Sequence, residues 1–346
     1  MKICIRLVII LEILIFPFVQ GCTNRDTRSA IEDEISLHVL DLEDVPGKWL
    51  FDSNRSARHT YLQYSYIIRN GEVETVLPES YIGNAKWSPD GVKILAKSAG
   101  STSGFIHVFV EGEKEMYVLE TNKLVNDLSW IDNRHIIYSD GWTSDKEIGY
   151  VILCDLETKE KKVVFEVPFG YEASDIHISH DRNRAIFNIN PIRSARGNTH
   201  MSRSVLVDLD SFKTKEINLI AGIAGWLQDN KTVIVTTNWK LDRSDFNNRF
   251  GVIARYNVET NELIAIKDNH AFYMQSTLSP DGRYIYYGKA TEGGGVAIFV
   301  QSLESNDEWQ ITKPVYVSDK VGMSHDLPTS WIPDDNVDFL RDLLNK

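Results

Sequence analysis

Three long polar loops hold most of the side chains that could bind a ligand. They span Asp140–Glu147, Asn190–Ser202 and Asn238–Arg249, and each follows an apolar, strand-like run. Basic and aromatic side chains gathered at one place suit a carboxylated sugar, another anionic ligand or an acidic protein surface, and ordinary solvated loops are the alternative. The candidate ligand-binding residues in these loops and in two later segments are Trp142, Arg193, Arg196, His200, Trp239, Lys240, Arg243, Tyr273 and His325.

Histidines offer a second kind of chemistry. His200, His270 and His325 would form a divalent metal site if their ring nitrogens met around one point, with ligand bonds of about 2.0–2.2 Å. His177 and His180 lie three apart across a strand end, so an extended backbone points them to opposite faces and they do not chelate together. A ligand site built from the loop residues needs no cofactor, whereas the alternative site built from the histidines needs a divalent metal.

Motifs that would establish catalysis are absent from the sequence. It contains no HExxH, no phosphate-binding P-loop and no GxSxG, and the segment 100–104 has threonine where a nucleophilic serine would stand. We therefore expect a non-catalytic binding or scaffold module. The alternative is a metal-dependent, saccharide-processing enzyme similar to propeller lyases.

A repeat of about 50 residues organises the chain, as in arrays of supersecondary units. It is marked by a bulky residue before a tight turn, and most copies continue into a β-rich run and a further pair of strands. Four short strands per repeat with almost no helical periodicity are typical of a β-propeller blade. We expect the bulky residues to pack between blades; they are Trp87, Trp130, Ile178, Trp226, Leu278 and Trp331.

Two copies carry the complete turn, in WSPDGVKILAK (87–97) and LSPDGRYIYYGK (278–289). These segments resemble the WD40-like repeat of TolB-like proteins and of the propeller domains of prolyl oligopeptidases. The resemblance implies an all-β propeller and, because TolB-like proteins work by protein contacts, favours a binding function. The expected partner is therefore a protein or a carbohydrate ligand.

Six turns predict a six-bladed propeller whose ring closes by joining the two ends of the chain. The strand around Trp331 would pair with an outer strand pair at Tyr61–Ile68 and Glu72–Leu77. The remaining strand would come from Lys48–Phe51 or from the C-terminal tail, and residues 336–346 could equally form a short helix. A seventh blade built from residues 37–77 is the main alternative.

The N-terminus has the pattern of a targeting segment. Lys2 and Arg6 precede an apolar run, Leu7–Val19, that is shorter than the roughly 20 residues needed to span a bilayer. The following Val-Gln-Gly-Cys22 resembles the bacterial lipobox, which implies cleavage before Cys22 and a lipid on its sulfur; an ordinary secretory signal is the alternative. The expected division is a signal peptide at 1–21, a lipidated cysteine and tether at 22–36, and a propeller with a short tail at 37–346.

The net charge limits the kinds of partner to expect, and the position of Cys154 indicates its structural role. With 37 basic and 49 acidic side chains the net charge is −12, so we expect no nucleic acid and contact with a membrane only through the lipid. Cys154 lies in an apolar run and is expected to be a small buried strand residue. The expected location is the bacterial cell envelope, at the outer membrane facing the periplasm if the cell is Gram-negative.

Overall fold

A computed structural model defines the fold, and every element assigned among its described residues is a β-strand. Within those residues no helix is long and apolar enough to cross a membrane. The structure describes residues 48–53, 64–69, 72–75, 85–99, 103–110, 117–121, 123–141, 148–192, 202–217, 219, 221–237, 251–269, 273–279, 281–290, 296–310 and 326–332. The predicted signal segment, Cys22, the tether and the C-terminal tail lie outside these ranges.

The described strands form six four-stranded antiparallel sheets, five of them built from four consecutive strands. Two of these five sheets come first in the chain: β4 (Lys86–Trp87), β5 (Lys93–Ala99), β6 (Gly104–Val110) and β7 (Tyr117–Thr121), and then β8 (Val125–Trp130), β9 (His135–Asp140), β10 (Gly149–Asp155) and β11 (Lys161–Val167). The next two are β12 (Tyr171–Ile178), β13 (Arg184–Pro191), β14 (Arg203–Asp208) and β15 (Thr214–Ile217), and then β16 (Gly222–Trp226), β17 (Thr232–Thr237), β18 (Gly251–Asn257) and β19 (Leu263–Asn269). The last of the five is β20 (Tyr273–Leu278), β21 (Tyr284–Ala290), β22 (Val296–Ser302) and β23 (Glu308–Gln310). The other sheet has the order β24 (Asp326–Ile332), β1 (Lys48–Ser53), β2 (Tyr64–Arg69) and β3 (Glu72–Thr75).

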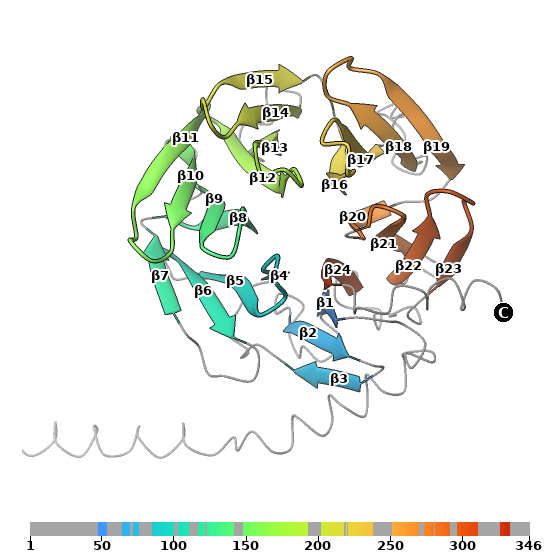
Figure 1. Cartoon of the computed structure of the whole chain (residues 1–346), viewed down its shortest axis with the longest axis horizontal. Coiled ribbons are helices and arrows are strands. Elements are labelled where there is room, and N and C mark those ends of the chain that lie inside the picture. The colour runs from blue at the N-terminus through green and yellow to red at the C-terminus, as the bar shows by residue number, and fades with distance from the viewer. Residues whose placement is uncertain are drawn as a thin grey trace, which may run out of the picture.

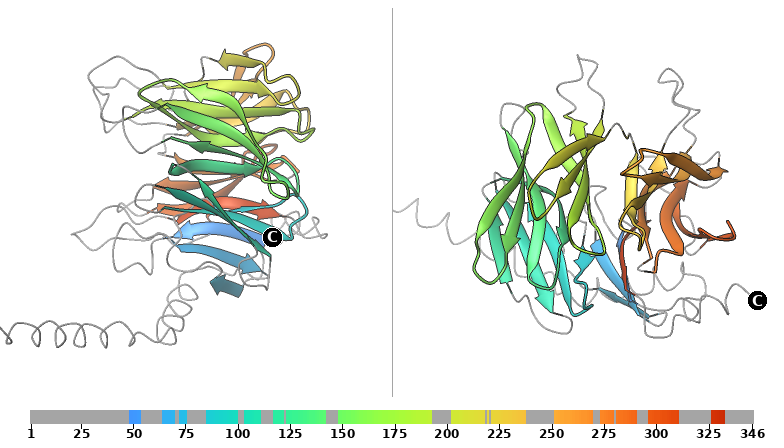
Figure 2. Two further views of the ribbon diagram at one scale, coloured as in Figure 1. Left: turned by 90° about the vertical axis from the view of Figure 1, so that its left-hand side faces the viewer. Right: turned by 45° about the horizontal axis from the view of Figure 1, so that its top comes forward.

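The sheets are arranged radially around a common axis, which makes the protein an all-β β-propeller (Figure 1). The innermost strands touch in cyclic order, β4 with β8, then β12, β16, β20, β24 and back to β4. Two tilted views show the sheets side by side with their strands running between the two faces of the ring (Figure 2).

Pairing of β24 with β1 joins the two ends of the chain. Lys48 lies opposite Ile332 and Ser53 opposite Asp326, so the first strand of the chain is the second strand of the closing sheet. The sequence did not decide whether the remaining strand of the closing sheet comes from Lys48–Phe51 or from the C-terminal tail. The pairing shows that it is Lys48–Ser53. The alternative of a seventh blade built from residues 37–77 is wrong, because β1, β2 and β3 share a sheet with β24.

The Ser-Pro-Asp-Gly turns have the geometry that their residues predict. At the first of them Gly91 has φ of 70° and donates its N–H to the carbonyl of Ser88, while the Ser88 hydroxyl accepts the N–H of Lys93. Degenerate copies keep the same geometry without glycine, since Arg182 and Asn230 have φ of 62° and 55°. The turn is therefore repeated more faithfully than its sequence.

The tryptophans before the turns pack between sheets, as predicted for the described ones. Trp87, Trp130 and Trp226 are each at most 5% exposed. The indole Nε1 of Trp130 donates to the carbonyl of Lys86, in the innermost strand of the preceding sheet, at 3.0 Å. Cys154 is a free, buried strand residue, which confirms its predicted role, and burial raises the pKa of its thiol.

Candidate functional site

One face of the ring carries the connections between sheets, and we call it the connection face. The connection that leads into β8 contains Lys123 and Leu124. The carbonyl of Lys123 accepts the N–H of Gly104 at 3.0 Å, and that of Leu124 accepts the N–H of Gly141 at 3.3 Å. Lys123 Nζ also donates to the carbonyl of Ile148 at 2.6 Å. Loops between second and third strands therefore share this face with the connections, and the Ser-Pro-Asp-Gly turns lie on the opposite face, which we call the turn face.

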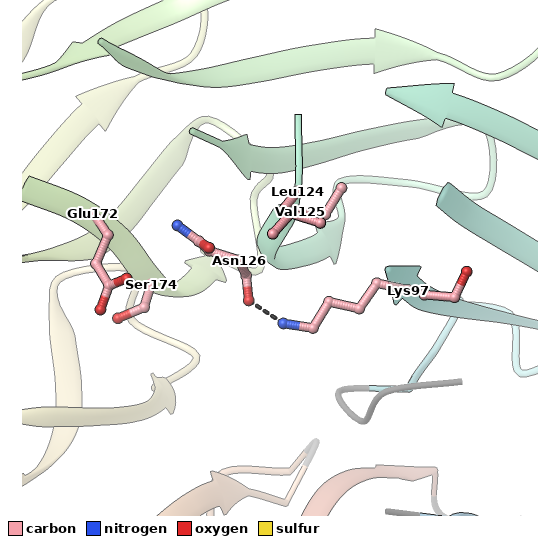
Figure 3. Close-up of a pocket in the computed structure, with 7 residues that line it drawn as sticks. Lys97, Leu124, Val125, Asn126, Glu172 and Ser174 are labelled. Carbon is pink, nitrogen blue, oxygen red and sulfur yellow. Dashed lines mark hydrogen bonds between the residues drawn. The ribbon is translucent and has the colours of Figure 1, made fainter. Parts of the chain in front are cut away.

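A pocket of about 290 Å³ opens among three consecutive sheets at the connection face (Figure 3). The end of β5 contributes one wall and the beginnings of β8 and β12 contribute the others. Lys97 Nζ donates to the backbone carbonyl of Asn126, and Glu172 and Ser174 lie on the far side of Asn126 from Lys97. The lining residues are Lys97, Ser98, Leu124, Val125, Asn126, Glu172 and Ser174.

Irregular pairing in the innermost strands shapes this pocket. The register between β8 and β9 shifts between Val125 and Asp127, which leaves Asn126 as an extra residue. The register of β12 against β13 shifts in the same way between Ser174 and His177. Bulges of this kind redirect side chains and are common beside binding sites. The amide Nδ2 of Asn126 is buried and has no hydrogen-bond partner among the residues that the structure describes.

A layer of buried charge lies directly beneath the pocket. Asp127 is 4% exposed, and its carboxylate accepts the backbone N–H of Leu128 at 2.8 Å and that of Ile176, in the next sheet, at 2.7 Å. Lys86, from the preceding sheet, approaches Asp127 at 3.5 Å and donates to the carbonyl of Ile176 at 3.4 Å. Burial alone would raise the pKa of Asp127, but Lys86, Lys97 and these N–H groups hold it below its usual value.

Asp175 and His177 lie beside this layer, each only partly exposed, and their pKa values shift in opposite directions. Burial, together with the charge of Asp127, raises the pKa of Asp175 to about 6. Burial, together with Lys86, lowers the pKa of His177 to about 3, so the imidazole is neutral at pH 7. Asp175 has φ of 54°, and its carboxylate accepts the Nδ2 of Asn188 at 2.9 Å.

Asp175→Asn is expected to raise stability at neutral pH, because asparagine tolerates this backbone conformation and can still accept from Asn188. From about pH 4 to pH 6 the folded protein holds the Asp175 proton that the unfolded chain releases, so the native carboxyl costs stability as pH rises through this window. At pH 7 the variant should be more stable by about 2–3 kcal/mol, and the difference should vanish near pH 4.

Urea unfolding of parent and variant from pH 4 to pH 8 measures this difference. His177 contributes a pH dependence of the opposite sign below pH 6.5, but it does so in both proteins and cancels in the comparison. Asp210→Asn, in an exposed hairpin turn, is the matched control for an Asp-to-Asn change at the surface. If the unfolding free energies of variant and parent differ by the same amount from pH 4 to pH 8, the result would contradict a raised pKa for Asp175.

Most of the candidate ligand-binding residues predicted from the sequence lie outside the described residues. Tyr273 begins β20, but only its backbone is described. Those outside the described residues are Trp142, Arg193, Arg196, His200, Trp239, Lys240, Arg243 and His325, together with His270 of the alternative metal site. The residues that line the pocket were not predicted, because they lie on or beside strand ends, whereas the predicted binding residues lie mostly in loops; they include Lys97, Asn126, Glu172 and Ser174.

The described part of the chain holds no group of three or more histidine, cysteine, aspartate or glutamate side chains that could hold a metal ion. His177 lies in β12, whereas His180 lies in the turn beyond it and its Nε2 hydrogen-bonds to the carbonyl of Trp226 at 2.9 Å. The two histidines are thus apart, as predicted. His200, His270 and His325 lie in segments that the structure does not describe.

Fold and site together define a β-propeller protein with a polar pocket on its connection face. Its structural neighbours include TolB from Acinetobacter baumannii, with a TM-score of 0.60 and 14% identity over 84% of this chain and 68% of that one. A putative TolB from Agrobacterium tumefaciens matches with a TM-score of 0.51 and 12% identity over 84% and 99% of the two chains. The β-propeller domain of the trilobed protease from Pyrococcus furiosus matches with a TM-score of 0.50 and 17% identity over 77% and 81%.

These likenesses confirm the predicted resemblance to TolB-like and other propeller proteins, and at such low identity they show the fold alone. The chain matches no protein-family model and no curated protein.

Proposed function

We propose that this protein is a non-catalytic binding or scaffold module of the bacterial cell envelope, a six-bladed propeller anchored by lipid on Cys22. Its ligand is a protein or a saccharide, and its binding surface is the connection face. The observation that carries the proposal is the pocket, because three sheets contribute polar side chains to one opening on that face.

The direction of the first strand supports this choice of face. Innermost strands run from the connection face to the turn face, so β24 ends at the turn face with Ile332. Lys48 lies opposite Ile332, and β1 therefore begins at the turn face. The described chain thus enters the ring on the side away from the pocket, which supports the connection face as the binding surface.

Exposed apolar side chains beside the connection make the same face suitable for a protein. Phe169 is 61% exposed and Ile148 is 44% exposed. They are neighbours, because Gly149 pairs with Val167 at the adjoining strand ends. Apolar side chains rimmed by polar groups are typical of protein interaction surfaces, and a pair of this size fits a modest, reversible contact.

The test is capture of envelope partners by the full chain and by two face-specific variants. Ile148→Asp with Phe169→Asp changes the connection face, and Val92→Asp changes an exposed side chain on the turn face. The proposal expects the first variant to lose at least about tenfold of the captured partner, equivalent to about 1.4 kcal/mol, and the second to retain it. Equal capture by both variants, or loss with the turn-face variant alone, contradicts the proposed binding face.

A metal-dependent enzyme is the second candidate, and it rests on the histidines at 200, 270 and 325. Metal analysis of the purified full chain, repeated with His270→Ala, tests it directly. Stoichiometric metal that is lost in the variant would favour the enzyme over the binding module.

A further inference from the structure

The pocket at the connection face is lined by Asn126, whose amide donor is unsatisfied among the described residues. Asn126 Nδ2 is buried and makes no hydrogen bond within the described part of the chain, although buried polar atoms in folded proteins nearly always have a partner. The atom belongs to a bulge residue of β8, and the same residue lines the pocket. Because this atom has almost no solvent-accessible surface, the Asn126 side chain must rotate slightly before an occupant of the pocket accepts its hydrogen bond.

The charges around the pocket are balanced. Lys97 supplies a cation on one wall and Glu172 an anion on another. Beneath them the cation of Lys86 faces the carboxylates of Asp127 and Asp175. The chain as a whole has a net charge of −12, which further disfavours an anion. A fully ionised ligand would therefore meet repulsion from one set of groups, whereas a neutral group that both donates and accepts would meet none.

The remaining walls suit hydroxyl groups and a small carbon skeleton. The hydroxyl of Ser174 accepts the Nδ2 of Asn190 at 2.9 Å and keeps its own proton to donate. Leu124 and Val125 add apolar surface, against which the C–H face of a ring can lie. The volume of about 290 Å³ is at the small end for ligand pockets and matches a single ring with its substituents.

We propose that this pocket binds one neutral sugar unit, with Asn126 Nδ2 donating to a sugar oxygen and Lys97 and Glu172 bonding its hydroxyls from opposite sides. The proposal deepens the proposed binding function by naming the ligand class, and it replaces the anionic sugar expected from the loop residues with a neutral one. Water molecules alone in the pocket are the competing possibility.

Saturation-transfer difference NMR on the full chain tests the proposal with the neutral sugars glucose, galactose, mannose and N-acetylglucosamine. Glucuronate and galacturonate are the matched anions, since each differs from its neutral parent only at one carbon. A single small ring with a few hydrogen bonds is expected to bind with a Kd of about 1–10 mM. At least one neutral sugar should bind, and its uronate should bind about fivefold more weakly or not at all.

Asn126→Asp removes the orphaned donor and should weaken binding of that sugar about fivefold. Asn261→Asp is the control, because Asn261 lies in a hairpin on the turn face and aspartate still accepts the hydroxyl of Tyr256 there. Lys97→Met probes the same pocket independently if the Asn126 variant does not fold, and it should weaken binding to a similar extent.

Three results would overturn the proposal: no binding of any neutral sugar, binding unchanged by both pocket variants, or a uronate that binds more tightly than its neutral parent. The capture experiment reports on the connection face separately. Capture that depends on Ile148 and Phe169 without any sugar binding would leave the proposed function standing and remove only the sugar site.

Discussion

Replacing Trp226 with alanine is expected to lower the free energy of unfolding by about 3–5 kcal/mol. The side chain is 2% exposed and belongs to the core cluster between two sheets. Its indole Nε1 donates to the carbonyl of His177, in the innermost strand of the preceding sheet, at 3.2 Å. Truncation therefore opens a cavity between sheets and leaves a buried carbonyl without its donor.

Urea unfolding followed by circular dichroism measures this loss. Trp226→Phe keeps most of the volume but not the N–H, and should cost less than the alanine variant. Phe169→Ala removes an aromatic side chain that is 61% exposed and should change stability by no more than about 0.5 kcal/mol. A cost below about 1 kcal/mol for Trp226→Ala would mean that the residue does not hold the sheets together.

The second large effect is expected at Asp127, where replacement by asparagine should cost about 3–5 kcal/mol. The two carboxylate oxygens accept backbone N–H groups from two different sheets, and Lys86 lies beside one of them. An asparagine offers one oxygen, and its NH₂ group would face an N–H or the ammonium of Lys86. The substitution thus leaves a partly buried lysine without its charge partner.

A double-mutant cycle separates this interaction from simple loss of packing. Lys86→Met should itself be destabilising, and the double variant should recover part of the loss, with a coupling of about 0.5–3 kcal/mol. Asp307→Asn is the matched control, because Asp307 is exposed in a hairpin turn. Strictly additive losses at positions 86 and 127 would show that the pair does not couple the sheets.

The repeated parts of the fold could be predicted because they depend on local chemistry. Pro89 and Gly91 fix the turn by their own backbone preferences, and the tryptophans recur at the spacing of one sheet. The run Tyr284–Tyr287 is aromatic and β-branched, which favours a strand covered on both faces, and all four side chains are at most 6% exposed. The closing partner of β24 could not be assigned, since it depends on pairing between the two ends of the chain.

The pocket could not be predicted, because its key positions are created by irregular strand pairing. Asn126 and Asp175 look like ordinary polar residues in the sequence, and they become bulge residues only when β8 and β12 pair with their neighbours. The buried contact of Lys86 with Asp127 joins residues 41 positions apart in different sheets. The available signal was a polar residue three or four places before the bulky residue that ends the innermost strand, and such residues are too common to stand out.

Closure of the ring by the two ends of the chain is the central structural claim, and a pair of engineered cysteines tests it most directly. Asp52 and Leu327 are direct partners across β1 and β24, so Asp52→Cys with Leu327→Cys should form a disulfide under mild oxidation. Asp52→Cys with Ile332→Cys is the control, because Ile332 lies opposite Lys48, about 13 Å further along the strand. A disulfide in the first variant alone is the predicted result, and equal cross-linking in both variants, or none in the first, would contradict the closed ring.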